Sequence, residues 1–242
     1  MEVRSTRIDT DGLVGVLCTP AAPQPAPGVL LLGGSEGGMH ERDAHALAAE
    51  GFTALALAAV SVAGSGVVTQ GIDFRRGALL DILGTPTNPW TLHGRPLPYL
   101  PHAVTAELRE RVEREDPVPL RLAYPPLPDD PEALTAISIA VEHTAAAVLV
   151  ICGEDDGMWP SAKYSQVALD RLGGHPRAVR QSILPGVGHP IAGAPGEPFT
   201  ATTSPGPGVT FELGGTPAAN SAARTSAWKE TVGFLADHLA VA

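Results

Sequence analysis

The sequence predicts one α/β domain built on a mainly parallel sheet that helices flank. Continuous apolar runs of strand length predict strands buried on both faces at 28–32, 52–58 and 147–152. A helical pattern over 39–50 separates the first two runs and ends at Gly51, a typical residue just past a helix. A strand, a helix and a strand in this order predict a right-handed crossover between parallel strands.

Composition favours a single domain without a nucleic-acid or membrane partner. The chain has 242 residues, 44% of them hydrophobic, which suits one domain over 1–242 with a sizeable core. Its formal charge of −10 would repel phosphates over most of the surface. Residues 1–7 precede no apolar run typical of a signal peptide, and every apolar stretch is too short to span a bilayer. We therefore expect a cytoplasmic protein, with Cys18 and Cys152 as buried free thiols.

Local patterns predict the remaining elements in chain order. Residues 1–20 alternate polar and apolar side chains, which predicts an edge hairpin. Residues 64–142 are irregular and rich in proline, with charged helical stretches at roughly 103–115 and 131–142. A long irregular segment inside one domain is usually functional, so we expect 64–142 to be a lid-like insertion.

The C-terminal third returns to a regular pattern. We predict a helix from Pro160 to Gly173, a short strand at 179–183, a glycine- and proline-rich loop over 192–217, and a final helix from Pro217. Helices and strands therefore alternate here as they do at the start of the chain, which again favours a parallel sheet.

Asp156 is the first candidate for chemistry, because it follows the buried strand 147–152 directly. Open α/β sheets place their sites at the carboxyl ends of strands, and a carboxylate there can hold a histidine in one tautomer. The alternative is structural. Asp155 or Asp156 could simply cap the helix that begins near Trp159.

His189 favours catalysis over the structural alternative. It lies in a tight, glycine-flanked turn after the strand 179–183, where small neighbours let an imidazole project. The order of strand, acid, helix, strand and histidine is that of an α/β-hydrolase triad after its nucleophile. We therefore predict an α/β-hydrolase-like domain with Asp156 and His189 as its acid and histidine.

The turn Gly33–Gly38 contains a G-x-S-x-G pattern between a strand and a helix, so Ser35 could be a nucleophile. A nucleophile strand is central, however, and only an edge hairpin precedes this turn. We interpret the turn first as an oxyanion loop that uses backbone N–H groups of Gly34, Ser35 and Glu36, second as a plain turn, and third as the nucleophile. It lacks a Walker lysine, and Glu36 would repel phosphate, so we expect no nucleotide cofactor; we also expect no metal.

Several ordered motifs resemble those of a known family. They are Gly28–Gly38, Gly51–Ala58, Gly153–Ser161, Pro185–His189 and Gly214–Asn220. They are similar to the C-terminal hydrolase domain of the acyl-CoA thioesterase / bile acid-CoA:amino acid N-acyltransferase family, in its bacterial branch. The resemblance covers nearly the whole chain. It implies an α/β-hydrolase fold and acyl transfer from thioesters or related esters, with Asp156 as acid, His189 as base and Gly34–Ser35 in the oxyanion loop.

The chain departs from this family after Ala58. In the family, the matching strand is followed by a helix, the nucleophile strand with its elbow, and another helix. Here Ala58 runs directly into the later strand, which resembles residues 59–68. We therefore expect the central nucleophile strand and its adjacent helices to be missing. Loss of a central strand leaves its neighbours to pair again or to expose an edge, so we expect a rearranged sheet or a homo-oligomer.

Two hypotheses of function follow. The first is an acyl-ester or acyl-thioester hydrolase or acyltransferase with a small substrate, in which Asp156 orients His189. Its nucleophile is then a substitute, Ser35 or Ser65, or a water molecule that His189 activates. The second is a non-catalytic remnant that binds a small molecule or a protein partner. Its pocket walls would be aromatic residues, namely Trp90, Tyr99 and Trp159.

Overall fold

The computed structural model of the chain describes most of its length. The described residues are 2–10, 13–21, 28–29, 41–53, 58–196, 200–206 and 209–239. The predicted turn Gly33–Gly38 and most of the first predicted buried strand lie outside them, as does the middle of the second.

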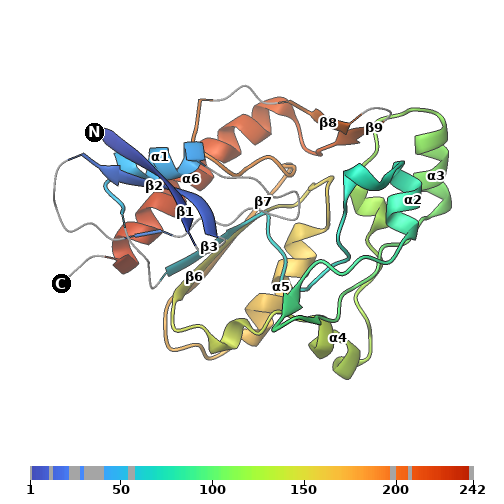
Figure 1. Cartoon of the computed structure of the whole chain (residues 1–242), viewed down its shortest axis with the longest axis horizontal. Coiled ribbons are helices and arrows are strands. Elements are labelled where there is room, and N and C mark those ends of the chain that lie inside the picture. Colours follow the sequence, from blue (N-terminus) through green and yellow to red (C-terminus); the bar gives the residue numbers. More distant parts are fainter. Residues whose placement is uncertain are drawn as a thin grey trace.

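The central sheet is parallel, as the sequence predicts. It consists of β3 (Ala58–Val62), β6 (Ala147–Gly153) and β7 (Val179–Leu184), in the spatial order β3-β6-β7 (Figure 1). Val62 pairs with Ile151, and Cys152 pairs with Ile183, so the carboxyl ends of all three strands meet at one edge. That edge is where the loops with Asp156 and His189 begin.

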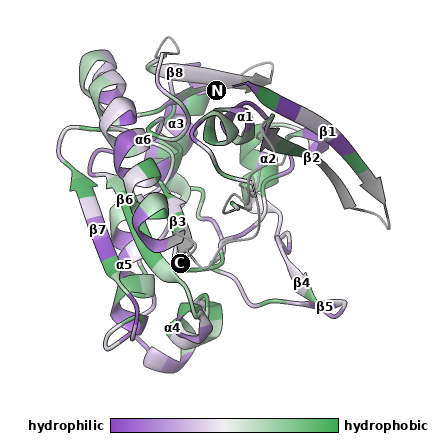
Figure 2. Ribbon diagram, turned by 90° about the vertical axis from the view of Figure 1, so that its left-hand side faces the viewer, coloured by the Kyte–Doolittle hydropathy of each residue, from purple (hydrophilic) through white to green (hydrophobic). Residues whose placement is uncertain are grey.

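The strands of this sheet differ in burial. Every residue of β6 is buried, whereas β7 is mostly exposed, and Figure 2 shows hydrophilic residues along β7. A strand that is apolar throughout suits the middle of a parallel sheet, and a mixed strand suits its border. The uninterrupted apolar run that predicts β6 is therefore explained by its central position.

Antiparallel hairpins surround the sheet. β1 (Val3–Thr10) and β2 (Leu13–Pro20) form the N-terminal hairpin that the alternating pattern predicts, but among the described residues this hairpin is a two-stranded sheet of its own and not an edge of the parallel sheet. The helix α1 (Glu41–Ala49) follows, and its Leu47 is buried. A second hairpin joins β8 (Thr202–Gly206) to β9 (Val209–Glu212). It lies where the sequence predicts only a loop.

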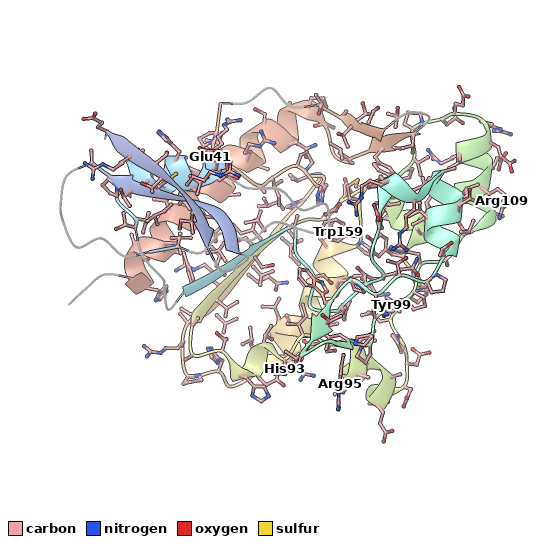
Figure 3. The ribbon with its side chains drawn as sticks, viewed as in Figure 1. Glu41, His93, Arg95, Tyr99, Arg109 and Trp159 are labelled. Atoms are coloured by element: carbon pink, nitrogen blue, oxygen red, sulfur yellow. The ribbon has the colours of Figure 1, made fainter. Side chains whose placement is uncertain are left out.

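The segment 64–142 contains short elements. They are η1 (Phe74–Arg76), α2 (Leu79–Gly84), β4 (Thr91–Leu92), β5 (Arg95–Pro96), α3 (Ala106–Glu113), η2 (Leu120–Ala123), α4 (Pro131–Ile137) and η3 (Val141–His143). Two apolar clusters include most of the helical elements: one joins η1, α2, α3 and η2 to Phe211 of β9, and the other joins α4 to Tyr164. Figure 3 shows His93 and Arg95 at the β4–β5 hairpin, away from Trp159. A role as a lid stays a prediction.

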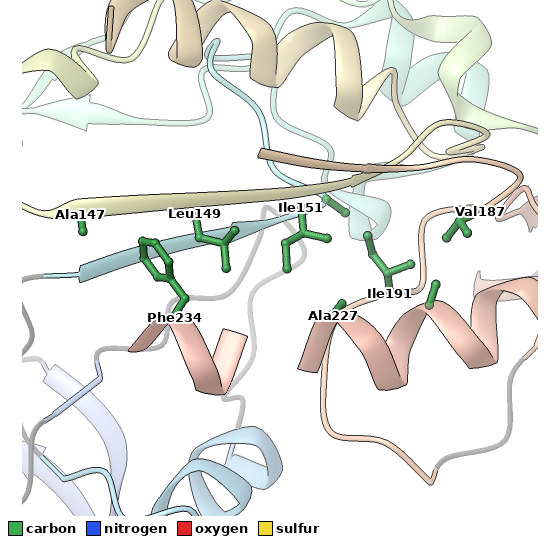
Figure 4. Packing of buried hydrophobic residues seen from close by; sticks show 9 residues of the cluster. Ala147, Leu149, Ile151, Val187, Ile191, Ala227 and Phe234 are labelled. Atoms are coloured by element: carbon green, nitrogen blue, oxygen red, sulfur yellow. The ribbon is translucent and has the colours of Figure 1, made fainter. Parts of the chain in front are cut away.

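Helices cover both faces of the sheet, and β6 alternates between them. Its residues Leu149 and Ile151 point toward α6 (Pro217–Leu239) and belong to one apolar cluster with Phe234 and Ala227, and Figure 4 shows Phe234 beside Leu149. Its Val148 and Val150 face the other way, toward Leu169 of α5 (Ser161–Arg171) and its neighbours. The sheet is therefore the middle of three layers, with α6 on one face and α5 on the other, and the acid and histidine loops begin at its carboxyl edge. No helix among the described residues is long and apolar enough to span a membrane.

Candidate active site

Asp156 lies in the loop that follows β6, and its side chain is almost fully buried, with 1% exposed. Its Oδ1 accepts hydrogen bonds from the backbone N–H groups of Met158 (2.8 Å) and Trp159 (3.3 Å). Asp156 is not the cap residue of α5, which is Pro160, but its Oδ1 makes the i+2 and i+3 contacts of a capping carboxylate within the loop before that helix. One carboxylate oxygen therefore orders the acid loop and the other remains available.

His189 meets that second oxygen. Its Nδ1 lies 3.0 Å from Oδ2 of Asp156, and 24% of its side chain is exposed. Because a carboxylate only accepts, Nδ1 donates this hydrogen bond, and in the neutral form of the ring Nδ1 therefore carries the N–H. Nε2 is then the nitrogen with a free lone pair. No described residue forms a hydrogen bond with it, so it can accept a proton from a substrate, a hydroxyl or water.

Trp159 lies against the imidazole. Its ring centroid is 4.4 Å from that of His189, with a T-shaped geometry, and its Nε1 donates to the carbonyl of Ala63 at 3.0 Å. Ala63 directly follows β3 and has a left-handed conformation, with φ of 49°. Figure 3 places Trp159 between the sheet and the segment 64–142. The indole thus links the end of β3 to His189, whereas the sequence suggests only a pocket wall.

The backbone before α6 connects the two loops of the site. The carbonyl of Leu213 accepts hydrogen bonds from the N–H of Gly157 (3.1 Å) and from the N–H of His189 (2.8 Å). The N–H of Asp155 also donates to the carbonyl of Val187 at 2.9 Å. The acid loop, the histidine loop and the 213–215 segment therefore form one backbone network. Sequence reasoning missed this network, because its acceptors are main-chain carbonyls.

Glycines make this contact possible. A Cβ atom at Gly188 would lie 2.1 Å from the carbonyl oxygen of Gly214, and one at Gly153 would lie 2.3 Å from that of Gly188. Real Cβ atoms essentially never come so close to backbone atoms. The glycines of the two motifs therefore serve close packing of main chains beside Asp156 and His189.

The candidate nucleophiles have different positions. Ser65 is described, and its hydroxyl donates to the carbonyl of Val67 (2.8 Å) and accepts from the N–H of Val67 (3.1 Å). No described contact joins it to His189. Gly34, Ser35 and Glu36 lie outside the described residues. Ser65 and Ser35 therefore stay predictions as nucleophiles, as does the oxyanion role of Gly34, Ser35 and Glu36.

The thiol of Cys152 is not activated as a nucleophile. Cys18 and Cys152 are buried and free, which confirms the expectation of buried thiols. Burial raises the pKa of the Cys152 thiol, so it stays protonated. Within the described residues, no group of His, Cys, Asp or Glu could hold a metal ion.

Two other features lie apart from the Asp156–His189 pair. A cavity of about 420 Å³ beside Gly214 and Gly215 is lined by Arg111 and Glu212 among others, and it includes neither residue of the pair. Trp90, suggested as a pocket wall, has 56% of its surface exposed.

The chain is similar to known proteins over nearly its whole length. Residues 23–241 match the family model described as "BAAT / Acyl-CoA thioester hydrolase C terminal". Acyl-coenzyme A amino acid N-acyltransferase 2 of Rattus norvegicus is 27% identical over 290 residues, which cover 98% of this chain and 66% of that protein. Acyl-coenzyme A thioesterase 2, mitochondrial, of Homo sapiens is 28% identical over 283 residues, covering 98% of this chain and 57% of that protein.

A shorter match is to the peroxisomal succinyl-coenzyme A thioesterase of Mus musculus. It is 32% identical over 102 residues, which cover 42% of this chain and 24% of that protein. The chain spans less than two thirds of the length of these curated relatives.

Proposed function

Because the chain belongs to the BAAT / acyl-CoA thioester hydrolase C-terminal family, we propose that it is an acyl-thioester hydrolase or acyltransferase centred on His189 and Asp156. The observation that carries the proposal is the 3.0 Å hydrogen bond from Nδ1 of His189 to the buried carboxylate of Asp156. It presents Nε2 as a base at the carboxyl edge of the sheet, where α/β folds place their sites. The names of the curated relatives support acyl-CoA thioesters as the substrate class.

The chemistry follows from the free lone pair of Nε2. Nε2 removes the proton from a serine hydroxyl or from water as the oxygen attacks the thioester carbonyl. Asp156 stabilises the imidazolium that forms, and the tetrahedral intermediate collapses when the carbon–sulfur bond breaks. The imidazolium returns its proton to the leaving thiolate. With water as nucleophile the products are a carboxylic acid and a thiol; with serine, an acyl-enzyme passes its acyl group to water or an amine.

The nucleophile is Ser35, Ser65 or water in this proposal, and backbone N–H groups of Gly34, Ser35 and Glu36 stabilise the oxyanion. For Ser65 to attack, its hydroxyl must leave the carbonyl of Val67 and turn toward His189. Direct activation of water by His189 needs no such movement. We therefore place water ahead of Ser65 for hydrolysis.

A second candidate is a non-catalytic remnant of the fold, and the alignment lengths favour it. The alignment with the rat relative runs over 290 residues against the 242 of this chain, so at least 48 aligned positions have no residue here. A gap of this size is large enough for a strand and two helices, the segment that we infer to be missing after Ala58. Without a nucleophile elbow, the fold would bind an acyl thioester or a partner without turning it over.

An assay of thiol release from acyl-CoA esters of increasing chain length tests the proposal. We expect His189→Ala to lower kcat/KM by about 100-fold or more, as for removal of a general base. His143→Ala is the matched control, because His143 is exposed at the end of η3. Parent-like turnover in His189→Ala would contradict the role of His189. Absence of turnover in the folded parent would favour the non-catalytic remnant instead.

A further inference from the structure

Asn220 is a fully buried polar residue outside the proposed reacting groups. It lies in the first turn of α6, and none of its surface is exposed. Buried amides are costly unless both ends of the side chain form hydrogen bonds. The partners of this amide therefore show what it holds together.

Both ends of the Asn220 amide bind backbone groups of the site. Its Oδ1 accepts from the N–H of Gly188 at 2.6 Å, and its Nδ2 donates to the carbonyl of Gly214 at 2.9 Å. Gly188 directly precedes His189. Gly214 directly follows Leu213, whose carbonyl accepts the N–H of His189. One side chain thus bridges the histidine loop and the segment that supports it.

The contact leaves little freedom to either loop. Gly188 and Gly214 approach so closely that a Cβ on Gly188 would lie 2.1 Å from the Gly214 oxygen. A Cβ on Gly215 would lie 2.5 Å from Oδ1 of Asn220. Main chains packed at this distance depend on the hydrogen bonds between them for their register. Loss of the amide would leave the buried N–H of Gly188 and the partly buried carbonyl of Gly214 without partners, and the loops would shift to satisfy them.

From these contacts we propose that Asn220 is a positioning residue for His189. Its amide fixes the peptide that leads into His189 and thereby keeps the imidazole Nδ1 on the carboxylate of Asp156. The catalytic consequence rests on the proposed function, whereas the effect on the imidazole does not. This separation allows the two to be tested independently.

Gln70 provides a matched control. It is also a buried amide, with 3% exposed, and its Nε2 donates to the carbonyls of Leu83 and Thr85 while its Oε1 accepts the N–H of His102. It joins segments of the 64–142 region, and among the described residues it forms no hydrogen bond with Asp156, His189 or the loops that carry them. Asn220→Leu and Gln70→Leu both remove buried hydrogen bonds, so both should lower the free energy of unfolding.

The decisive readout is the state of the His189 ring, measured by ¹⁵N–¹H correlation NMR in the full chain. We expect Asn220→Leu to decrease the population of the Nδ1–H tautomer and to shift the ring resonances, whereas Gln70→Leu leaves them at the parent positions. Asn220→Asp keeps an oxygen for the N–H of Gly188 and removes the donor to Gly214, so its effect should be intermediate. If Asn220→Leu does not fold, Asn220→Asp takes its place in this measurement.

Activity provides the second readout. We expect Asn220→Leu to lower kcat by about tenfold to a hundredfold through misplacement of the base, with little change in KM. His189 resonances in both Asn220 variants that match the parent would overturn the proposal. If the parent shows no turnover, the proposed function fails, and the ring resonances alone still decide the role of Asn220.

Discussion

Asp156 divides its two carboxylate oxygens between structure and the imidazole. Oδ1 accepts two backbone N–H groups of its own loop, and Oδ2 faces Nδ1 of His189. A buried carboxylate with such partners is held in a single orientation. The identities of this acid and this histidine could be predicted from sequence, because each follows a predicted strand. Asn220 could not be assigned a role, because its partners are main-chain atoms of loops distant in sequence.

At the scale of a single residue, the burial of His102 predicts how stability depends on pH. Burial lowers its pKa from 6.5 to about 4, and both ring nitrogens are buried without a partner among the described residues. The folded state therefore binds this proton less readily than the unfolded state, and its stability falls as the pH drops from about 6.5 through about 4.

The expected loss is about 2 kcal/mol between pH 7 and pH 5, relative to a variant without the titrating group. His102→Phe keeps an aromatic ring beside Tyr124, with which His102 makes a T-shaped contact. Urea unfolding of both proteins at the two pH values measures the difference. The same pH dependence in parent and variant would contradict the burial of a neutral His102.

At the scale of elements, the strand β6 and the helix α5 could be predicted closely. The apolar run 147–152 corresponds to β6 (Ala147–Gly153), because a strand covered by helices on both faces needs no polar residue. The hairpin β8–β9 was missed. Its sequence is rich in glycine and proline, and its Phe211 also forms a bridge with Val118, a residue that it meets only in the folded chain.

Local pattern alone could not place β3, although the family resemblance implies a strand within 59–68. An apolar run continues from Phe52 to Ala63 without a turn residue, so local pattern leaves the start of the strand open. Pairing with β6 decides it, because Ala58 aligns with Ala147 and Val62 with Ile151. Among the described strands, β3 forms hydrogen bonds on one side only, with β6.

The edge of β3 leads to a prediction about thermal stability and self-association. If the nucleophile strand is missing after Ala58, the outer N–H and C=O groups of β3 lack the neighbour that the family provides. We expect low thermal stability or self-association that protects this edge. Light scattering after size exclusion and a melting curve test this expectation together. A monomer at all concentrations with a high melting temperature would contradict the inferred loss of the strand.

At the scale of the whole molecule, the candidate site lies where three loops meet at one edge of the sheet. β6 provides the acid loop, β7 provides the histidine loop, and the segment before α6 connects them through Leu213. The parallel architecture and the order of motifs could be predicted from sequence, since both depend on local pattern. The joining of the loops could not, because it requires contacts between residues far apart in the chain.

The central claim is that Asp156 and His189 act as one catalytic unit on acyl thioesters. The most direct test measures kcat/KM for acyl-CoA hydrolysis in the parent, Asp156→Asn, His189→Ala and the double variant. We predict similar losses in the two single variants and no greater loss in the double variant, since residues that act together give non-additive effects. Losses that multiply in the double variant, or parent-like hydrolysis in Asp156→Asn, would contradict the claim.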